Sequence, residues 1–234
     1  MNDSAVAGMF GRIVRFYDVL NRVLSLGFDQ RWRAVLAQSA LQAVTHNKVV
    51  ALDLAAGTLD VALALRRVRP DISADMRVLA LDFCPPMLER GRRKLVGENA
   101  VLPVAADAKK LPLPDASVHC VTMAFGIRNI TPRAIAFDEM LRVLKKGGRA
   151  CILEFGSGRE RIWGGVYNVY LNVVLPRIGR FFSGDSAAYD YLVETIRAFP
   201  TATTLEDELR AAGFARVWHI RLTSGIVCLH VGEK

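Results

Sequence analysis

The feature that most constrains the fold is a set of five short apolar runs between residues 49 and 155, separated by helix-like segments. Buried parallel strands have this appearance because helices cover both faces of their sheet. Parallel neighbours need crossover connections, which helices supply in right-handed units. We therefore expect an α/β fold with a parallel sheet, its strands at Val49–Leu54, Arg77–Asp82, Val101–Ala106, Val118–Phe125 and Arg149–Phe155.

Helices are expected in the gaps between these runs. The helix Val61–Val68 stops at Pro70, and the helix Pro132–Leu144 stops at Gly147-Gly148. Between them, Pro85-Pro86 opens a further helix, because proline is tolerated in a first helical turn.

The segment that precedes the first strand is predicted to be helical. Between residues 10 and 45, apolar side chains recur at three- and four-residue steps, with Arg12, Arg15 and Arg22 among them. A basic amphipathic helix either lies on a membrane surface or packs on its own domain. We interpret residues 1–45 as an N-terminal helical cap, with packing on the domain as the commoner arrangement.

The last third of the chain has a different pattern. Residues 156–203 contain no clean strand and many aromatic residues. A helix at Leu205–Ala212, capped by Gly213, then precedes two closing strands at Val217–Leu222 and Ile226–Val231. The 156–203 insert is predicted to be a helical substrate lid, and a helical pair that completes the core is the alternative. Residues 1–234 then form a single domain.

The cysteines indicate no structural zinc site and a reducing compartment. Cys84, Cys120, Cys151 and Cys228 lie far apart and form no C-x-x-C pair. The most apolar stretch, residues 49–65, contains two aspartates and falls short of the roughly 20 apolar residues of a membrane span. The first ten residues include an aspartate and lack a basic stretch, which argues against a cleaved signal peptide. We expect a cytoplasmic protein.

The net charge of +8 favours an anionic partner. Nucleic acid and an anionic membrane both fit, and so do basic residues that merely form solvated helix faces. The densest basic run, Arg90–Lys94, lies on a predicted surface helix. No RNA-recognition, zinc-finger or helix-turn-helix signature accompanies it, so we expect no nucleic-acid partner.

Three aspartates stand at or near the ends of the first three strands, and together they indicate an adenosine-bearing cofactor. Asp53 lies near the end of the first strand, Asp82 ends the second, and Asp107 follows the third. Ligands of open parallel sheets bind at the carboxyl ends of the strands. A carboxylate after the second strand can accept both ribose hydroxyls, and one after the third can meet the adenine amine. Each aspartate alone is weak evidence, because aspartate is common in turns and helix caps.

The loop after the first strand favours S-adenosylmethionine over a dinucleotide. Ala55-Ala56-Gly57-Thr58-Leu59-Asp60 has one glycine, whereas a dinucleotide site needs G-x-G-x-x-G to approach the pyrophosphate. The Asp60 carboxylate at the mouth of the next helix would also repel a pyrophosphate. A sulfonium cofactor without phosphate suits this loop better, and no nucleoside triphosphate motif is present.

Beyond these features, sequence blocks along nearly the whole chain carry a resemblance. The sequence resembles the bacterial and mitochondrial quinone C-methyltransferases, the family that methylates demethylmenaquinone and 2-polyprenyl-6-methoxy-1,4-benzoquinol. This resemblance implies a Rossmann-like, seven-stranded methyltransferase fold with N-terminal helices and a helical insert before the last two strands. The blocks are Tyr17–Asn21, Ser25–Phe28 with Trp32, Leu52–Thr58, Asp82–Leu88, Ala106–Ala108, Leu111–Asp115, Phe125–Asn129, Met140–Lys145, Leu175–Gly179, Tyr189–Ile196 and Leu222–Val227.

The resemblance also implies a set of cofactor contacts. Ala124 stands where family members often carry serine, and the lost hydroxyl contact should cost about 1 kcal/mol. Leu59 stands where the family usually has glycine, which puts cofactor affinity in question. The predicted cofactor-binding residues are Asp53, Ala55, Gly57, Thr58, Asp82, Asp107, Ala108 and Ala124.

The implied reaction is methyl transfer to a ring carbon of a reduced quinone, which requires a phenolate and close alignment of the reacting atoms. The resemblance places Arg128 beside the substrate; arginine is a poor base, so we assign it phenolate stabilisation. Its alternative role is a structural salt bridge. Asn129 is expected to help position it, and Tyr17 and Trp32 either close the site or pack as ordinary helix residues. No metal is required.

Partners and alternatives follow from this assignment. The substrate is a prenylated quinol whose tail partitions into membrane, so we expect peripheral contact with the cytoplasmic membrane surface. Phe181 and Phe182 either meet the isoprenoid tail or pack in the core, and Asp185 is a weak site candidate. A homodimer is left open. The rival functions are methylation of another small molecule and, because of Leu59, a non-catalytic S-adenosylmethionine-binding homologue.

Overall fold

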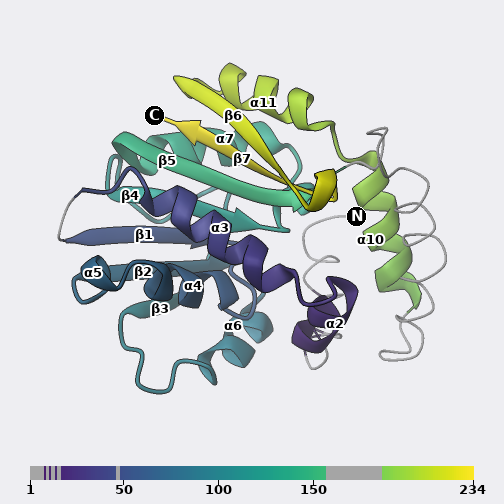
Figure 1. Ribbon diagram of the computed structural model, residues 1–234, viewed down its shortest axis with the longest axis horizontal. Coiled ribbons are helices and arrows are strands. Elements are labelled where there is room, and N and C mark those ends of the chain that lie inside the picture. Colours follow the sequence, from purple (N-terminus) through teal and green to yellow (C-terminus); the bar gives the residue numbers. More distant parts are fainter. Residues whose placement is uncertain (1–7, 9–10, 12–13, 15–16, 46–47, 157–185) are drawn as a thin grey trace.

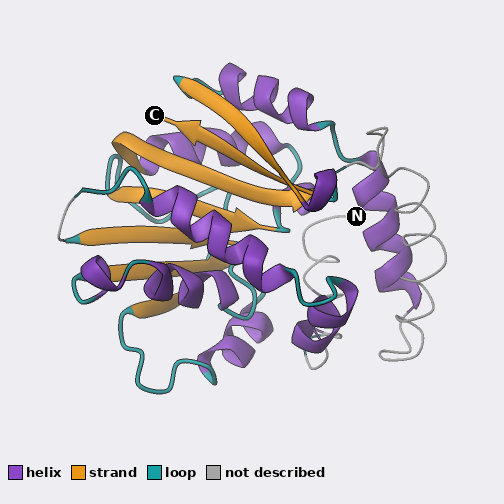
Figure 2. Ribbon diagram, viewed as in Figure 1, coloured by secondary structure: helices purple, strands orange, loops and turns teal. Residues whose placement is uncertain are grey.

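Each apolar run of the sequence forms a strand of one sheet in the computed structural model, which describes residues 8, 11, 14, 17–45, 48–156 and 186–234. Seven strands lie in the order β3-β2-β1-β4-β5-β7-β6 (Figures 1 and 2). The predicted seven-stranded α/β fold is confirmed. The strands are β1 (Val49–Leu54), β2 (Met76–Asp82), β3 (Val101–Ala105), β4 (Val118–Ala124), β5 (Leu144–Phe155), β6 (Arg216–Leu222) and β7 (Val227–Glu233).

The strand order reverses between β1 and β4. Strands β1 to β5 pair in parallel, whereas β7 is antiparallel to both β5 and β6. The chain builds outward from β1 through β2 to β3, then returns to place β4 on the other side of β1. The chain that leaves β1 and the chain that leaves β4 continue to helices on opposite faces of the sheet, and ligands of such sheets bind at the strand ends where the order reverses.

Helices cover both faces of the sheet (Figure 1). On one face lie α3 (Asp29–Leu41), α4 (Asp60–Val68) and α6 (Pro85–Arg92), whose apolar side chains join those of β1 and β2. On the other lie α7 (Arg133–Val143) and α11 (Ala202–Ala211), around Phe137, Met140 and Leu205. The two hydrophobic cores fix the sheet between two helical layers. A short helix, α5 (Pro70–Ser73), follows α4 directly.

Between residues 17 and 41 the chain forms two helices, whereas the sequence predicted helical character for residues 10–45 as a whole. After α2 (Tyr17–Leu24), the chain turns through Leu26 and Gly27, which have positive φ angles of 51° and 80°, before α3 begins. Helix α3 buries Leu36 and Leu41 against the sheet, so packing on the domain is confirmed for it. Helix α2 lies beyond α3, at the edge toward which β1 and β4 point (Figures 1 and 2).

The fifth strand is longer than predicted. We expected Gly147-Gly148 to end a helix, but α7 ends at Val143 and β5 begins at Leu144, so both glycines lie within the strand. The pairing with β4 shifts register between Val118 and Cys120. At Gly148 a Cβ would lie 2.7 Å from the carbonyl oxygen of His119, so only glycine allows the strands to approach there.

The C-terminal elements match the predicted helix and strand pair with one shift. Helix α11 begins at Ala202, because the Thr201 hydroxyl accepts a hydrogen bond from the Thr204 N–H and caps it. It is preceded by α10 (Ser186–Ala198), and η3 (Thr223–Gly225) joins β6 to β7. Of the predicted 156–203 insert, residues 157–185 lie outside the described residues, and so do Phe181, Phe182 and Asp185.

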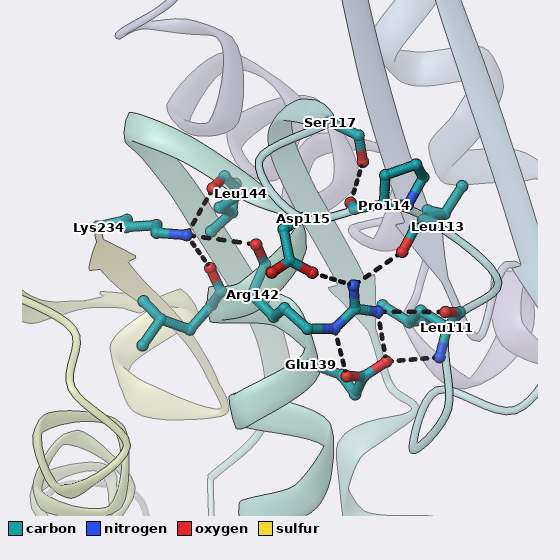
Figure 3. A network of polar contacts seen from close by, with 10 residues as sticks. Leu111, Leu113, Pro114, Asp115, Ser117, Glu139, Arg142, Leu144 and Lys234 are labelled. Carbon is teal, nitrogen blue, oxygen red and sulfur yellow. Dashed lines mark hydrogen bonds and ion pairs between the residues drawn. The ribbon is translucent and has the colours of Figure 1, made fainter.

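Two of the sequence blocks that carry the family resemblance hold each other in place (Figure 3). Arg142 of α7 pairs with Glu139 at 2.6 Å and Asp115 at 2.7 Å, and it donates to the carbonyl oxygens of Leu111 and Leu113. The terminal Lys234 ammonium donates to carbonyl oxygens at the end of α7, which favours a cation there. These blocks thus have a structural role at a distance from the strand ends.

Within the described residues, none of the helices is both long and apolar enough to cross a membrane, and no cluster of three or more metal-binding side chains occurs. The four cysteines are buried and unpaired with one another.

Candidate active site

A pocket with about 870 Å³ of empty space opens at the carboxyl ends of β1, β2 and β4, where the strand order reverses. Six segments of the chain contribute to it: α2, the loops that follow β1, β3 and β4, the end of β2 with the turn after it, and α6, which supplies Met87. Its lining combines small residues, acids and aromatic rings: Tyr17, Leu54, Ala55, Gly57, Leu81, Asp82, Phe83, Cys84, Met87, Ala106, Asp107, Ala108, Lys109, Ala124, Phe125, Gly126, Asn129 and Ile130.

Asp82 organises the first part of the pocket. Its Oδ2 accepts the Gly57 N–H and its Oδ1 accepts the Cys84 N–H, each at 2.7 Å. The carboxylate thereby fixes the loop after β1 against the end of β2. Burial raises the pKa of Asp82, and the two N–H donors oppose that rise. Each carboxylate oxygen has a further lone pair, so Asp82 retains acceptors for a ligand in the pocket.

Asp107 and Ala108 form the neighbouring wall after β3. Asp107 Oδ1 accepts the Lys109 N–H at 2.8 Å, which closes a tight turn at the strand end. The Ala106 N–H donates to the Asp82 carbonyl oxygen at 3.0 Å and joins this turn to β2. Two of the three predicted acids, Asp82 and Asp107, thus line one pocket.

Asp53 lies deeper than the other two acids and does not line the pocket. It is fully buried, accepts a hydrogen bond from the Thr122 hydroxyl at 2.8 Å, and leaves Oδ2 without a hydrogen-bond partner among the described residues. Burial raises the pKa of Asp53 from 3.8 to about 7. An acid in this environment responds strongly to any cation placed near it.

Thr58 also lies outside the pocket lining, although the resemblance implied a cofactor contact. It is 2% exposed, and its hydroxyl bonds Asp18 and Lys94. Like the contact predicted for Asp53, its contact with the cofactor stays a prediction.

Leu59 turns away from the pocket. It precedes α4 with a φ of 70°, the left-handed region that explains why glycine suits this position. Its side chain is fully buried in the core against Gly91, where a Cβ would lie 2.5 Å from Leu59 Cγ. The backbone cost of roughly 1–2 kcal/mol is matched by the roughly 1.5–3 kcal/mol gained by burying leucine. The departure from glycine therefore fills the core and leaves the cofactor space open.

The loop after β4 approaches the loop after β1 closely. At Gly126 a Cβ would lie 2.4 Å from the Ala55 Cβ, so glycine is required for this contact. Phe125 before it has a φ of 58° and its ring lies 4.7 Å from that of Phe155. Ala124 and Asn129 line the pocket on either side of this turn.

The Arg128 side chain forms a buried ion pair behind this loop. Its Nη1 lies 2.7 Å from Glu154 Oε1 and donates to the Phe125 carbonyl oxygen at 2.7 Å. The two side chains are only 7% and 1% exposed, and Arg128 Nε has no hydrogen-bond partner among the described residues. The structure thus contains the salt bridge considered as the alternative, together with an unused guanidinium donor. The catalytic role predicted for Arg128 stays a prediction.

Aromatic and polar residues from both ends of the chain meet at this side of the pocket. Tyr17 of α2 lines the pocket, and burial raises its pKa. The Trp32 indole N–H donates to the Thr223 hydroxyl at 2.8 Å, and its ring meets Phe125 edge-on at 6.3 Å. The Tyr191 hydroxyl donates to Asn129 Oδ1 at 3.1 Å.

Three residues that shape this site were missed in the sequence analysis. Glu154 was read as part of an apolar strand, although a carboxylate in such a run is itself a signal of a buried partner. Asp18 appears in the sequence analysis only as part of the Tyr17–Asn21 block, and Lys94 only as part of the basic run Arg90–Lys94 on a predicted surface helix. Their pairing across 2.9 Å depends on chain folding between distant segments.

A model of the ubiE/COQ5 methyltransferase family matches residues 1–234. The chain belongs to the ubiE/COQ5 methyltransferase family. A demethylmenaquinone methyltransferase of Clavibacter sepedonicus is 43% identical over 229 residues, covering 98% of this chain and 90% of the relative. A ubiquinone/menaquinone biosynthesis C-methyltransferase of Saccharophagus degradans is 38% identical, covering 98% and 91%. A SAM-dependent methyltransferase structure from Aquifex aeolicus shares the fold, with a TM-score of 0.57 at 19% identity, covering 84% and 88%.

As a member of the ubiE/COQ5 family, the protein is a methyltransferase that uses S-adenosylmethionine. The chemistry of its pocket fits that cofactor. Asp82 and Asp107 present acceptors to the pocket, and Asp53 has an orphaned carboxylate oxygen behind it. These negatively charged acceptors suit a cationic ligand with ribose hydroxyls and an adenine amine, and they disfavour a pyrophosphate.

Asp60, expected to repel a pyrophosphate, is instead paired with cations of the protein. Its carboxylate lies 2.7 Å from Lys94 Nζ and 3.5 Å from Arg33, so its charge is largely compensated within the protein. The exclusion of a pyrophosphate in this ubiE/COQ5 member rests instead on the pocket acids and the single glycine.

Proposed function

We propose that this protein methylates a ring carbon of a prenylated quinol in menaquinone or ubiquinone biosynthesis, with the conversion of demethylmenaquinol to menaquinol favoured. The observation that carries the proposal is the match to the ubiE/COQ5 family over the full chain. Relatives in that family bear the names demethylmenaquinone methyltransferase and ubiquinone/menaquinone biosynthesis C-methyltransferase. The first three of these relatives, at 41–43% identity, carry the menaquinone name, which supports the favoured substrate.

In this proposal the ends of β1, β2 and β3 bind the cofactor. Asp82 accepts the ribose hydroxyls, while Asp107 and the main chain of Ala108 meet the adenine. Gly57, Ala55 and Ala124 leave room for the cofactor chain, and Asp53 and Thr58 act from behind the pocket. When bound, S-adenosylmethionine supplies an activated methyl group on a sulfonium.

The side chains around the loop after β4 bind and activate the quinol, which is the methyl acceptor. The ring carbon is nucleophilic when the adjacent hydroxyl has lost its proton, so a phenolate must be stabilised. Arginine is a poor general base, so we assign Arg128 phenolate stabilisation instead. Arg128 does not line the pocket and its Nε is buried, so in this proposal the positive charge of its guanidinium, held by Glu154 behind the loop after β4, stabilises the phenolate.

Asn129 and Tyr17 complete the acceptor side. Asn129 lines the pocket and is oriented by the Tyr191 hydroxyl, so it positions the quinol ring next to Arg128. Tyr17 covers the pocket from α2 and excludes water from the phenolate. Phe125 lines the pocket, offering a flat apolar surface for the quinol ring.

We further propose that the protein is cytoplasmic and contacts the membrane surface peripherally, where its prenylated substrate resides. The turn between α2 and α3 exposes Leu26 and Phe28 at 80% and 39%, and Val19 of α2 is 52% exposed. Arg22 and Arg31 flank these side chains, and the chain carries a net charge of +8. Apolar residues beside arginines suit an anionic bilayer. Flotation with vesicles containing anionic lipid at low salt tests this, and an unbound protein would refute it.

The methyl transfer is tested by mass spectrometry of quinones from cells that lack the protein. Accumulation of demethylmenaquinone, reversed by the intact gene, is expected; accumulation of a demethylated benzoquinone would instead name the other head group. An assay with prenylated and unprenylated quinols separates the proposal from methylation of a small soluble phenol. An unchanged quinone profile together with no transfer to any quinol would refute the proposal.

A further inference from the structure

Thr58 anchors the N-terminal helix instead of projecting into the pocket. Its hydroxyl donates to Asp18 Oδ1 of α2 across 2.5 Å, and Lys94 Nζ donates to the same hydroxyl oxygen across 3.1 Å. The hydroxyl–carboxylate contact is charge-assisted and therefore among the stronger hydrogen bonds. The loop that carries the cofactor glycine is thus tied directly to α2.

Lys94 joins α2 to two further elements. Its ammonium lies 2.9 Å from Asp18 Oδ2 and 2.7 Å from Asp60 Oδ1, the first residue of α4, while Lys94 itself follows the end of α6. Asp60 in turn lies 3.5 Å from Arg33 of α3. Two acids and two bases, from α2, α3, α4 and the segment after α6, therefore meet here, and α2 is held through the Asp18 carboxylate.

The residue next to Asp18 covers the pocket. Tyr17 belongs to the pocket lining, and a Cβ added at Gly57 would lie 3.9 Å from Tyr17 Cε1, so the ring lies against the cofactor loop. Because Tyr17 and Asp18 share the first turn of α2, the position of Asp18 determines where the Tyr17 ring lies. Loss of the Asp18 contacts would free this end of the helix.

The contacts of Asp18 can open without breaking the core. The Lys94 and Asp18 side chains are 28% and 29% exposed, whereas those of Arg128 and Glu154 are 7% and 1% exposed. Water and salt ions reach the first pair, so its attraction is screened and its side chains can separate.

From this arrangement we propose that Asp18, Lys94 and Thr58 are positioning residues that hold Tyr17 over the cofactor pocket, and that their separation sets the rate at which the cofactor leaves. The inference rests on the cofactor part of the proposed function. It does not depend on which quinol accepts the methyl group.

The test is the dissociation rate of radiolabelled S-adenosylmethionine from the full chain, chased with excess unlabelled S-adenosylhomocysteine. Asp18→Asn and Lys94→Met should each speed dissociation by about five-fold, the upper range for a partly exposed ion pair. We call the contacts among Asp18, Lys94 and Thr58 the latch. Because both changes break the same latch, the double variant should dissociate as fast as each single variant. Raising salt should speed dissociation from the parent protein and leave the double variant unaffected.

A matched control is available on another part of the molecule. Arg133 and Glu208 pair at 2.7 Å with side chains 27% and 30% exposed, and neither lines the pocket. Glu208→Gln therefore removes an ion pair of the same exposure and should leave the dissociation rate unchanged. A purely structural role for the Asp18 pair would lower the melting temperature in the same way as this control, without faster dissociation.

Several outcomes refute the latch. Parental dissociation rates in both single variants would do so, and so would a double variant whose effect is the product of the two, about 25-fold. If Asp18→Asn does not fold, Lys94→Met and Thr58→Val provide the same comparison. A parent protein that retains no labelled cofactor would refute the cofactor site along with the latch, whereas retention with unchanged variant rates refutes the latch alone.

Discussion

The two sides of the pocket are built in different ways. On the cofactor side, formed by the ends of β1, β2 and β3, the acids Asp82 and Asp107 bond N–H groups 25 and two residues away in sequence. On the side proposed to hold the methyl acceptor, formed by α2, α3, η1 (Ile127–Asn129), η3 and the end of β5, the side chains bond residues far away in the chain. Trp32 and Thr223, for example, are 191 residues apart.

This difference separates what each side contributes. Main-chain donors hold the cofactor acids in place wherever the strands form, so that side follows from the fold itself. The acceptor side depends on charges and hydroxyls that meet only after the whole chain has folded. We therefore expect substitutions on the cofactor side to change cofactor affinity, and substitutions on the acceptor side to change stability, turnover or cofactor release.

The largest effect is expected for the buried pair on the acceptor side. Arg128→Met leaves the Glu154 carboxylate buried without its partner, which should lower the free energy of unfolding by about 3–5 kcal/mol. Urea denaturation of the parent and the variant measures this loss. A change below about 1 kcal/mol would show that water reaches Glu154 and that the pair is not a buried one.

A double variant then separates stability from catalysis. Arg128→Met with Glu154→Leu replaces both charges by apolar side chains, which should restore most of the unfolding free energy. Turnover should stay at the level of the single variant, because the positive charge that stabilises the phenolate is still absent. Recovery of turnover along with stability would mean that Arg128 acts only as a structural salt bridge.

The second largest effect concerns Asp53, whose pKa is raised by burial from 3.8 to about 7. Between about pH 4 and pH 7 the unfolded chain has released this proton and the folded protein keeps it, so unfolding free energy falls as pH rises. Asp53→Asn removes that dependence. The difference between parent and variant should change by on the order of 3 kcal/mol over this range, in favour of the variant at the higher pH.

A control at the surface has the opposite sign. Asp71 is exposed, and its pKa is lowered by a hydrogen bond from Arg69, so its contribution to stability is present above its unfolded pKa and is lost in acid. Asp71→Asn should therefore lower the free energy of unfolding slightly near neutral pH. Equal pH profiles for the Asp53 and Asp71 variants would show that Asp53 titrates normally.

The sequence predicted the cofactor side better than the acceptor side for the same physical reason. Buried strands can be recognised from local apolar runs in the sequence. Asp82 and Asp107 stand at the ends of two such runs, so the fold and the pocket could be inferred together. The register shift that lets β5 run through Gly148 could not be inferred, because it depends on the close approach of His119. A glycine pair predicts a helix end equally well.

The residues that join the cofactor loop to α2 show the limit of motif reasoning. Thr58 matches the family pattern for a cofactor contact, yet its hydroxyl bonds Asp18, 40 residues earlier. The sequence predicts that Asp60 repels a phosphate, but its carboxylate pairs with Lys94, 34 residues later. Such pairings are long-range, and no local pattern in one sequence encodes them.

Substitution of Leu59 tests whether this departure from glycine affects stability or cofactor affinity. Leu59→Gly relieves the left-handed backbone but empties a fully buried site beside Gly91, so we expect a net loss of about 2 kcal/mol in unfolding free energy. Cofactor affinity, measured by titration calorimetry, should stay within about two-fold of the parent, since the side chain does not line the pocket. A large gain in affinity would restore the idea of a degenerate cofactor site.

An effect of comparable size, on cofactor affinity instead of stability, is expected for Asp82 on the cofactor side. Asp82→Asn removes a charged acceptor that holds the Gly57 and Cys84 N–H groups and faces the pocket. Hydrogen bonds to charged groups contribute about 1.5–3 kcal/mol, so cofactor affinity should fall by roughly 10- to 100-fold. The dissociation constant from calorimetry checks this, and Asp71→Asn is the matched surface change. Parental affinity would remove Asp82 from the cofactor site.

The smallest effect is expected for Ala124→Ser, which adds a hydroxyl where β4 ends at the pocket. Ala124 is partly buried, so one extra oxygen fits without disturbing the core, and its hydrogen bond should contribute about 1 kcal/mol. Cofactor binding should tighten by about five-fold, and the dissociation rate should fall, while the unfolding free energy without cofactor stays unchanged. This isolates the cofactor side, because the added group touches neither the Arg128 pair nor the Asp18 latch. Weaker binding would mean that the cofactor lies too close to β4 to admit the oxygen, and that the alanine fits its shape.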